Sequence, residues 1–309
     1  MLSRTSHLLM SCWIFVILAV AMIHGSAVAA PQSEISLAYK AQAGDLLSYQ
    51  SSRTDTRATE REGETTEFTT TRIFDFDLQA EHADSLLSFV LTVKKLEITM
   101  EGARGGRGFP PLDPKVLEGK RLRIKITPAG EQRDISAIDS IPMPERPERA
   151  DDRPMRGRFG NPLNQVRINF IQLPTRRVKV GDTWTEPFKD MDGGAAGFFG
   201  RMIQDQKITG TTKYTVIGEE QKNGFKCLHL RIESNYSRSF ESQRQGNRIS
   251  GESEGETKAD VWFAPKEGLL VEYSLNDFNE GSTAFSGRTV PNSNESKVTL
   301  KLVSWKPKK

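Results

Sequence analysis

Strict alternation of apolar and polar side chains runs through most of this 309-residue chain and limits what it can fold into. In Leu87–Val93 every odd position is large and apolar, and after Lys94-Lys95 the apolar set moves to the even positions from Leu96 to Met100. A period of two is the repeat of a β-strand, whose successive side chains point to opposite faces. A one-residue slip is what a β-bulge produces, so the stretch predicts one long, bent strand.

The alternation recurs in residues 121–126, 228–232, 269–275 and 298–302. In 121–126, three basic residues alternate with Leu122, Ile124 and Ile126, which gives the strand one wet face and one dry face. Strands of this kind belong to antiparallel sheets with one solvated face. We therefore expect a mainly β fold of the α+β class, with a long, bent antiparallel sheet and a few short helices.

A weak internal repeat relates two halves of the chain. The matching stretches are 43–49 with 180–186, 70–76 with 211–217, 82–93 with 222–233, and 126–136 with 263–274. The four matches come in the same order, and each half reads as a Gly-Asp turn, a long hairpin and a further hairpin. We expect two similar halves, about 40–140 and 177–305, that share one sheet.

Residues 141–176 join the two halves. Residues 141–162 hold five prolines and many arginines, which is typical of an exposed, extended linker. Asn161 and Pro162 are residues that begin helices, and Val166, Phe170 and Ile171 follow at helical spacing. The pattern predicts one short helix after the linker, and residues 112–119 suggest a similar single turn in the first half.

The Gly-Asp turns raise the question of whether Gly181-Asp182-Thr183-Trp184 forms a site or starts a strand. The same pair occurs as Gly44-Asp45 at the matching point of the first half. Glycine permits the positive φ of a turn, and aspartate bonds the nearby backbone. We interpret the motif as a turn, with Trp184 as the first buried side chain of the strand that follows.

Residues 1–29 predict a cleaved secretory signal. Arg4 precedes an apolar run over residues 13–23, and Ala27-Val28-Ala29 forms a small-residue cleavage pattern. The run is shorter than the roughly 20 residues that span a bilayer, so we expect no stable transmembrane anchor. The remaining 30–309 would be a single β-rich domain, exported to the periplasm or the exterior.

The charge and cysteine content of the mature chain exclude several classes of protein. Removing residues 1–29 takes away Arg4 and lowers the net charge from +3 to +2, which favours no strongly charged partner. The Gly- and Arg-rich stretches 101–111 and 153–160 therefore read as loops, and we expect no nucleic-acid partner. Without Cys12, Cys227 is the one cysteine, so no internal disulfide forms.

We find no catalytic constellation, metal-ligand spacing or cofactor motif. Cys227 and His229 share the non-core face of one strand, about 6.5–7 Å apart at Cα, with no third group to orient the base. The favoured interpretation is an incidental cysteine near a surface histidine. Alternating carboxylates such as Glu252, Glu254 and Glu256 fit a solvated strand face, and a hydrolase is a distant alternative.

Several phrases together resemble a known family. They are the turn motif from Leu173-Pro174 through Val178-Lys179-Val180-Gly181-Asp182 to Trp184, with TTKYTVIGEE, GLLVEYS and ITPAGEQRDIS. The chain is similar to a bacterial family of exported proteins of unknown function, whose architecture resembles the LolA/RseB-like half-barrel proteins of the envelope. The resemblance implies a half-barrel with an apolar concavity and brings no catalytic residues.

Two functions from different classes follow. The first is an exported, non-enzymatic protein that binds a lipid-like or other apolar ligand in the groove of the bent sheet. The alternative is an envelope scaffold or protein-interaction module with a fully packed sheet and no small-molecule ligand. Glycine-rich residues 190–203 carry Phe198 and Phe199, which we expect either to gate the groove or to pack onto the sheet. The candidate groove-lining residues are Phe74, Phe76, Phe89, Leu91, Leu228, Leu230, Val271 and Tyr273.

Overall fold

The structure is a computed structural model. It describes residues 34–83, 85–102, 113–141, 166, 168, 170–188, 205–244, 247–285 and 287–308. The predicted signal sequence, most of the linker, and Phe198 and Phe199 lie outside the described residues.

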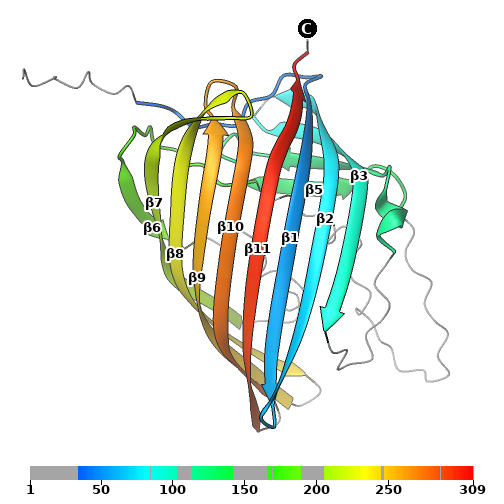
Figure 1. The fold of residues 1–309 in the computed structure, drawn as a ribbon, viewed down its shortest axis with the longest axis vertical. Helices are drawn as coiled ribbons and strands as arrows, with labels where there is room; N and C mark the ends of the chain where they lie inside the picture. Colours follow the sequence, from blue (N-terminus) through cyan, green and yellow to red (C-terminus); the bar gives the residue numbers. More distant parts are fainter. Residues whose placement is uncertain are drawn as a thin grey trace, which may run out of the picture. The chain divides into compact units, whose positions relative to one another are not determined.

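The described chain forms a single antiparallel sheet of 11 strands in the order β5-β4-β3-β2-β1-β11-β10-β9-β8-β7-β6. The first and last strands, β1 and β11, pair at its centre (Figure 1). The sheet is one continuous unit with β5 and β6 at its two edges. The strands are β1 (Leu46–Arg61), β2 (Glu64–Ala83), β3 (Leu87–Gly102), β4 (Arg121–Ile126), β5 (Gln132–Ala137), β6 (Thr183–Pro187), β7 (Asp205–Lys222), β8 (Phe225–Arg244), β9 (Asn247–Ala264), β10 (Leu269–Phe285) and β11 (Arg288–Lys306).

Helices are scarcer than the α+β prediction implied. The one helix in the described part of the chain is η1 (Pro114–Leu117), a 3-10 turn that Asp113 caps, as residues 112–119 predicted. It is not long enough to cross a membrane, and no other described segment is helical. The short helix expected after the linker is absent over the described residues Val166, Ile168 and Phe170–Leu173. The prediction was wrong for these residues: Val166 forms a bend, and Ile168 and Phe170–Leu173 have no regular secondary structure, while residues 161–165, 167 and 169 lie outside the described residues. Val166, Ile168, Ile171 and Leu173 are nevertheless buried, so packing against the rest of the chain holds this stretch without a helix.

Strand β3 confirms the bulge inferred from its slipped pattern. The register with β2 shifts between Asp75 and Phe76, which pair with Lys95 and Val93, so Lys94 is the extra residue. The slip keeps the apolar side chains on one face on both sides of the bulge, and Val93 and Leu96 are both buried.

The Gly-Asp turns that open the two halves are built alike. Gly44 and Gly181 have φ values of 98° and 87°, and each donates its N–H to a strand carbonyl, of Ala80 and Val216 respectively. In the second turn the Asp182 carboxylate accepts from the Lys179 N–H at 3.1 Å. Positive φ favours glycine, so both glycines serve the turn. The interpretation as a turn, not a site, agrees with this geometry.

The strand after the second turn buries its tryptophan less than expected. Trp184 is half-buried: it stacks on Tyr214 with ring centroids 5.1 Å apart, and the Arg176 guanidinium lies 5.1 Å from its ring centre. Its strand β6 lies at the edge of the sheet, so it has a neighbouring strand, β7, on one side only.

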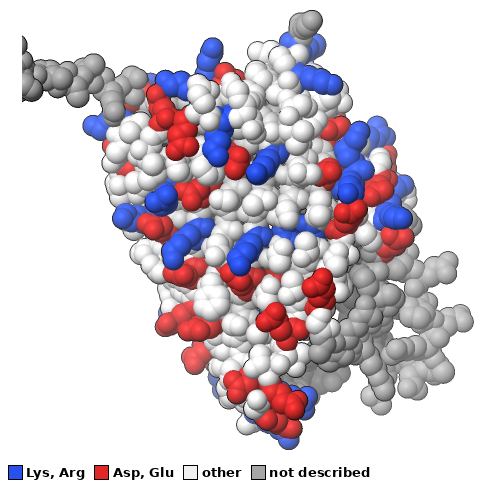
Figure 2. Space-filling view, in the orientation of Figure 1, with Lys and Arg blue, Asp and Glu red and all other residues white. Residues whose placement is uncertain are grey.

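The sheet has two chemically different faces. We call the face that carries Tyr49, Phe76 and Tyr273 the core face, because its side chains form the hydrophobic core. The opposite, outer face carries mixed rows of charged residues, such as Lys297 with Glu295 at 2.8 Å (Figure 2). This is the wet-and-dry alternation that the sequence predicted.

Candidate functional site

All eight predicted groove-lining residues belong to the hydrophobic core, and all are buried. Phe74 and Phe76 stack with ring centroids 4.6 Å apart, and Phe76 also stacks on Tyr49 at 5.6 Å. The core face is therefore one apolar surface, as predicted, but the chain itself covers it. Exposed fractions are Phe74 2%, Phe76 1%, Phe89 4%, Leu91 0%, Leu228 1%, Leu230 2%, Val271 0% and Tyr273 0%.

Part of the cover comes from residues that belong to no strand of the sheet. We call the described residues Val166, Ile168 and Phe170–Leu173 the covering segment. Its apolar side chains Val166, Ile168, Ile171 and Leu173 are 0%, 7%, 1% and 4% exposed. Its Phe170 ring stacks on Phe89, one of the predicted lining residues, with centroids 6.3 Å apart. The segment therefore occupies space in which the prediction expected a ligand.

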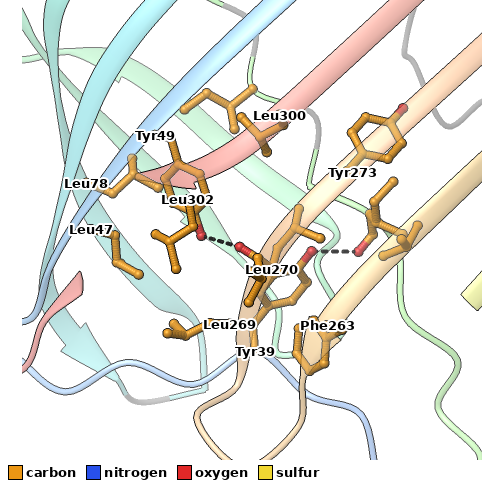
Figure 3. Close-up of a cluster of buried hydrophobic side chains, with 14 of the residues drawn as sticks. Tyr39, Leu47, Tyr49, Leu78, Phe263, Leu269, Leu270, Tyr273, Leu300 and Leu302 are labelled. Atoms are coloured by element: carbon orange, nitrogen blue, oxygen red, sulfur yellow. Dashed lines mark hydrogen bonds between the residues drawn. The ribbon is translucent and has the colours of Figure 1, made fainter. Parts of the chain in front are cut away.

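Tyr39 holds the covering segment against the sheet. The Tyr39 hydroxyl donates to the Ile171 carbonyl oxygen at 3.1 Å, and its ring meets Phe263 edge-on at 5.3 Å (Figure 3). At the end of the segment, the Leu173 N–H donates to the Ala129 carbonyl oxygen at 2.8 Å. Burial raises the pKa of Tyr39 well above its usual value, so this phenol stays neutral and able to donate. The segment is thus attached mainly by apolar packing, with a few polar contacts.

A small cavity of about 20 Å³ lies where Ile168 of the covering segment meets the sheet. This volume is about what one water molecule needs. One side of the cavity is apolar and the other carries two arginines, so it lies at the border of the apolar surface. Two predicted lining residues, Phe74 and Tyr273, meet there. The complete lining is Ser51, Arg53, Arg72, Phe74, Ile168, Tyr273, Val298 and Leu300.

Arg53 and Arg72 stand directly opposite each other on β1 and β2. Arg53 Nε donates to both carboxylate oxygens of Asp55, at 2.9 and 2.7 Å. Burial opposes ionisation of Asp55, but the hydrogen bonds and charge of Arg53 outweigh it, with further help from Ser296 and Arg72, and the pKa of Asp55 is lowered. The carboxylate is therefore ionised at neutral pH.

A polar row continues from Asp55 across the core face. The register passes from Asp55 through Ser296 to Asp277 and then to Thr257. Thr257 donates to Asp277 at 2.6 Å, and the Tyr236 hydroxyl donates to the same carboxylate at 3.1 and 3.2 Å. This row marks where the apolar surface ends, so the apolar region occupies the half of the core face that lies beyond it.

A second, larger concavity of about 910 Å³ lies at the hairpin-tip end of the sheet. The residues that line it lie mostly on the outer face. One set of cross-strand partners there runs from Ser293 through Glu280 and Glu254 to Ser237. The long sheet is therefore hollowed on its two faces at different ends. Four glutamates line this hollow, Glu60, Glu252, Glu254 and Glu280, with Lys207 as the one lysine among the lining residues. Acidic residues also gather at this end in Figure 2.

The hydrogen bonds of Cys227 and His229 go to other groups and not to each other. We expected both on the solvated face, with His229 as a surface histidine, but Cys227 is 1% and His229 7% exposed, and Cys227 belongs to the hydrophobic core. Burial raises the pKa of the Cys227 thiol to about 11. The two ring nitrogens of His229 contact Glu220 at 2.8 Å and Asp260 at 2.7 Å. Trp262 stacks on the histidine ring and donates its Nε1 hydrogen to Glu220, and these hydrogen bonds lower the pKa of Glu220.

The structure describes no group of three or more acidic, histidine or cysteine side chains that could hold a metal ion, within the residue ranges given above.

Comparison with known proteins gives no family. No family model matches the chain, and no curated protein matches it. Among solved structures, lipovitellin, described by its lipid–protein interactions, is similar with a TM-score of 0.46 and 13% identity over 87% of this chain. The match covers 26% of the lipovitellin chain.

Two bacterial structures are more distant. Pseudomonas aeruginosa OccK2 has a TM-score of 0.25 at 7% identity, over 84% of this chain and 98% of its own. A BenF-like porin from Pseudomonas fluorescens has a TM-score of 0.24 at 7% identity, over 84% of this chain and 99% of its own. The resemblance to LolA/RseB-like proteins stays a prediction.

Proposed function

We propose that this protein is an exported, non-enzymatic binding protein for a lipid-like ligand, which occupies the apolar half of the core face. The observation that carries the proposal is the covering segment: its described residues belong to no strand or helix, and its buried apolar side chains lie where the ligand would lie. A ligand would bind by displacing Ile168 and its neighbours from the sheet.

Burial on the apolar surface yields a similar free energy for the covering segment and for a lipid chain. Burying the four apolar side chains of the covering segment contributes about 6–12 kcal/mol, at about 1.5–3 kcal/mol each. A lipid chain of about 14 methylene groups gains about 11 kcal/mol at about 0.8 kcal/mol per group. Exchange between the segment and one acyl chain is therefore close to balanced, as reversible binding requires.

The absence of catalysis and the exported location are part of the proposal. Support for a non-enzymatic role comes from the histidine, whose two ring nitrogens face carboxylates, and from the buried thiol. Support for export comes from the signal-like residues 1–29. Activity that is lost on His229→Ala would contradict the first, and mature protein found in the cytoplasm would contradict the second.

The first experiment is mass spectrometry of an organic extract from natively purified mature protein. An unrelated exported protein carried through the same steps is the control. We expect a stoichiometric lipid with this protein only. Phe89→Asp should remove the lipid, while Val90→Asp, on the other face of the same strand, should retain it. A clean extract from folded protein that also fails to take up added lipid would refute the proposal.

The alternative function is an interaction module with a permanently packed sheet. The specific observation in its favour is that all eight predicted lining residues are at most 4% exposed. Under this alternative Phe89→Asp unfolds the chain, because a carboxylate is forced into a closed core. Unfolding of this variant together with a clean extract would favour the alternative.

A further inference from the structure

The core face carries two adjacent like charges at the border of its apolar half. Arg53 on β1 and Arg72 on β2 are direct cross-strand partners on that face. Like charges directly opposite each other on two strands destabilise the pair. An anion bound beside such a pair offsets the repulsion.

Asp55 is one anion beside the pair. Both carboxylate oxygens of Asp55 accept from Arg53 Nε, and Arg72 contributes through its charge. The lining of the small cavity beside them includes the two arginines and no carboxylate. The wall that faces the cavity is therefore cationic, whatever other hydrogen bonds the arginines make.

The position of this cationic wall matches one end of an amphiphile. Phe74, Val298 and Leu300 line the same cavity from the apolar side, and Ile168 of the covering segment closes it. If the covering segment leaves, the space freed by Ile168 joins the cavity to the apolar surface. A molecule lying there has its chain on the apolar surface and one end against two guanidinium groups.

We propose that Arg53 and Arg72 bind the anionic head of the ligand, so that the protein selects anionic amphiphiles such as fatty acids over neutral ones. The proposal rests on the proposed function and specifies its ligand class. Guanidinium groups suit this task because they stay charged and donate paired hydrogen bonds to a carboxylate or phosphate. Away from bulk water, such hydrogen bonds contribute more than they would at the surface.

The test compares oleate with oleyl alcohol, which have the same chain and differ in charge at the head. Binding of each to the mature protein is measured by calorimetry, with the probes kept monomeric. We expect oleate to bind about 10–100-fold tighter, which is the effect of one charge-assisted hydrogen bond. Arg72→Gln should bring this ratio close to one, and Arg72→Lys should restore part of it.

The matched control is Arg231→Gln. Arg231 also stands on a strand and contacts a carboxylate, with its Nε 3.3 Å from Asp260, but on the outer face. The oleate preference should survive this change. Equal loss in Arg231→Gln and Arg72→Gln would overturn the proposal, because general surface charge would then explain the preference.

The remaining outcomes separate the two proposals. Equal binding of oleate and oleyl alcohol to the unmodified protein overturns the head site but leaves the apolar site standing, and this result needs no variant to fold. Binding of neither probe overturns both. Acetate and inorganic phosphate supply the charge without a chain, and either one competing fully with oleate would show a plain anion site instead.

Discussion

Shortening Ile171 of the covering segment to alanine should weaken the ligand-free protein and strengthen ligand binding at the same time. Ile171 is 1% exposed and its carbonyl accepts from Tyr39, so its side chain is part of the core in the covered state. Truncating a buried isoleucine to alanine costs about 2–5 kcal/mol. We take about 3 kcal/mol as the loss for the covered state.

The free energy that the covered state loses should make ligand binding more favourable by the same amount. Binding must first displace the covering segment, so the apparent dissociation constant depends on how rarely the uncovered state occurs. Weakening the segment by about 3 kcal/mol raises the apparent affinity about 100-fold, at 1.4 kcal/mol per factor of ten. The gain ends when the uncovered state becomes the major one.

Two assays measure the two effects. Urea unfolding without ligand gives the stability loss, and displacement of a fluorescent apolar probe gives the affinity. Leu117→Ala is the matched control, because Leu117 is also fully buried but lies in η1, outside the covering segment. It should lose similar stability and gain no affinity. A folded Ile171→Ala protein that binds no tighter than the parent would refute the idea that the segment and the ligand compete.

Three other predictions concern stability and reactivity. Cys227 is 1% exposed with a pKa raised to about 11, so a thiol reagent at pH 8 should label it only in denaturant, and rapid labelling of the native protein would contradict its burial. Because folding lowers the pKa of Asp55, its ionised carboxylate stabilises the folded state. This contribution is fully present above the pKa of the unfolded state, about 3.9, and is lost as the pH falls through the lower pKa of the folded state. Asp55→Asn should therefore reduce the acid sensitivity of the urea midpoint, and an unchanged pH profile would show that the carboxylate gains nothing on folding. Gly130→Ala should destabilise far more than Gly181→Ala, because both have positive φ but an added Cβ strikes the covering segment only at Gly130, and equal urea midpoints would exclude that clash.

The strands were predictable because they depend on local pattern. Alternation in residues 87–100 located β3, its buried face and its bulge, since a period of two and a one-residue slip are visible without any tertiary contact. The Gly181-Asp182 turn was predictable for the same reason, because its positive φ and its side-chain contact to Lys179 lie within a few residues.

The cover on the core face was not predictable from local pattern. Residues Val166, Phe170 and Ile171 have helical spacing, yet none of the three is helical, and Val166 and Ile171 are buried. Packing against a distant sheet decided the conformation. The choice of lining residues followed from strand alternation, whereas their complete burial depends on this long-range contact.

The two concavities and the arginine pair depend on register and curvature. Arg53 and Arg72 lie on separate strands, and only the pairing of β1 with β2 makes them neighbours. Glu254 and Glu280 looked like ordinary solvent-facing residues, and the hollow that they share comes from the bending of long strands. Alternation cannot show which end of a face is hollow.

The pairing of β1 with β11 has a consequence for how the chain folds. Leu46 pairs with Lys306, so residues from opposite ends of the sequence meet at the centre of the sheet. Closing so long a loop makes folding slow, because much chain entropy is lost before the contact forms. A nascent chain without its last strand would have two half-sheets with unpaired edges facing each other. The sheet is therefore continuous only once β11 is in place, which favours aggregation of products truncated before β11 and a folding rate limited by the pairing of this strand.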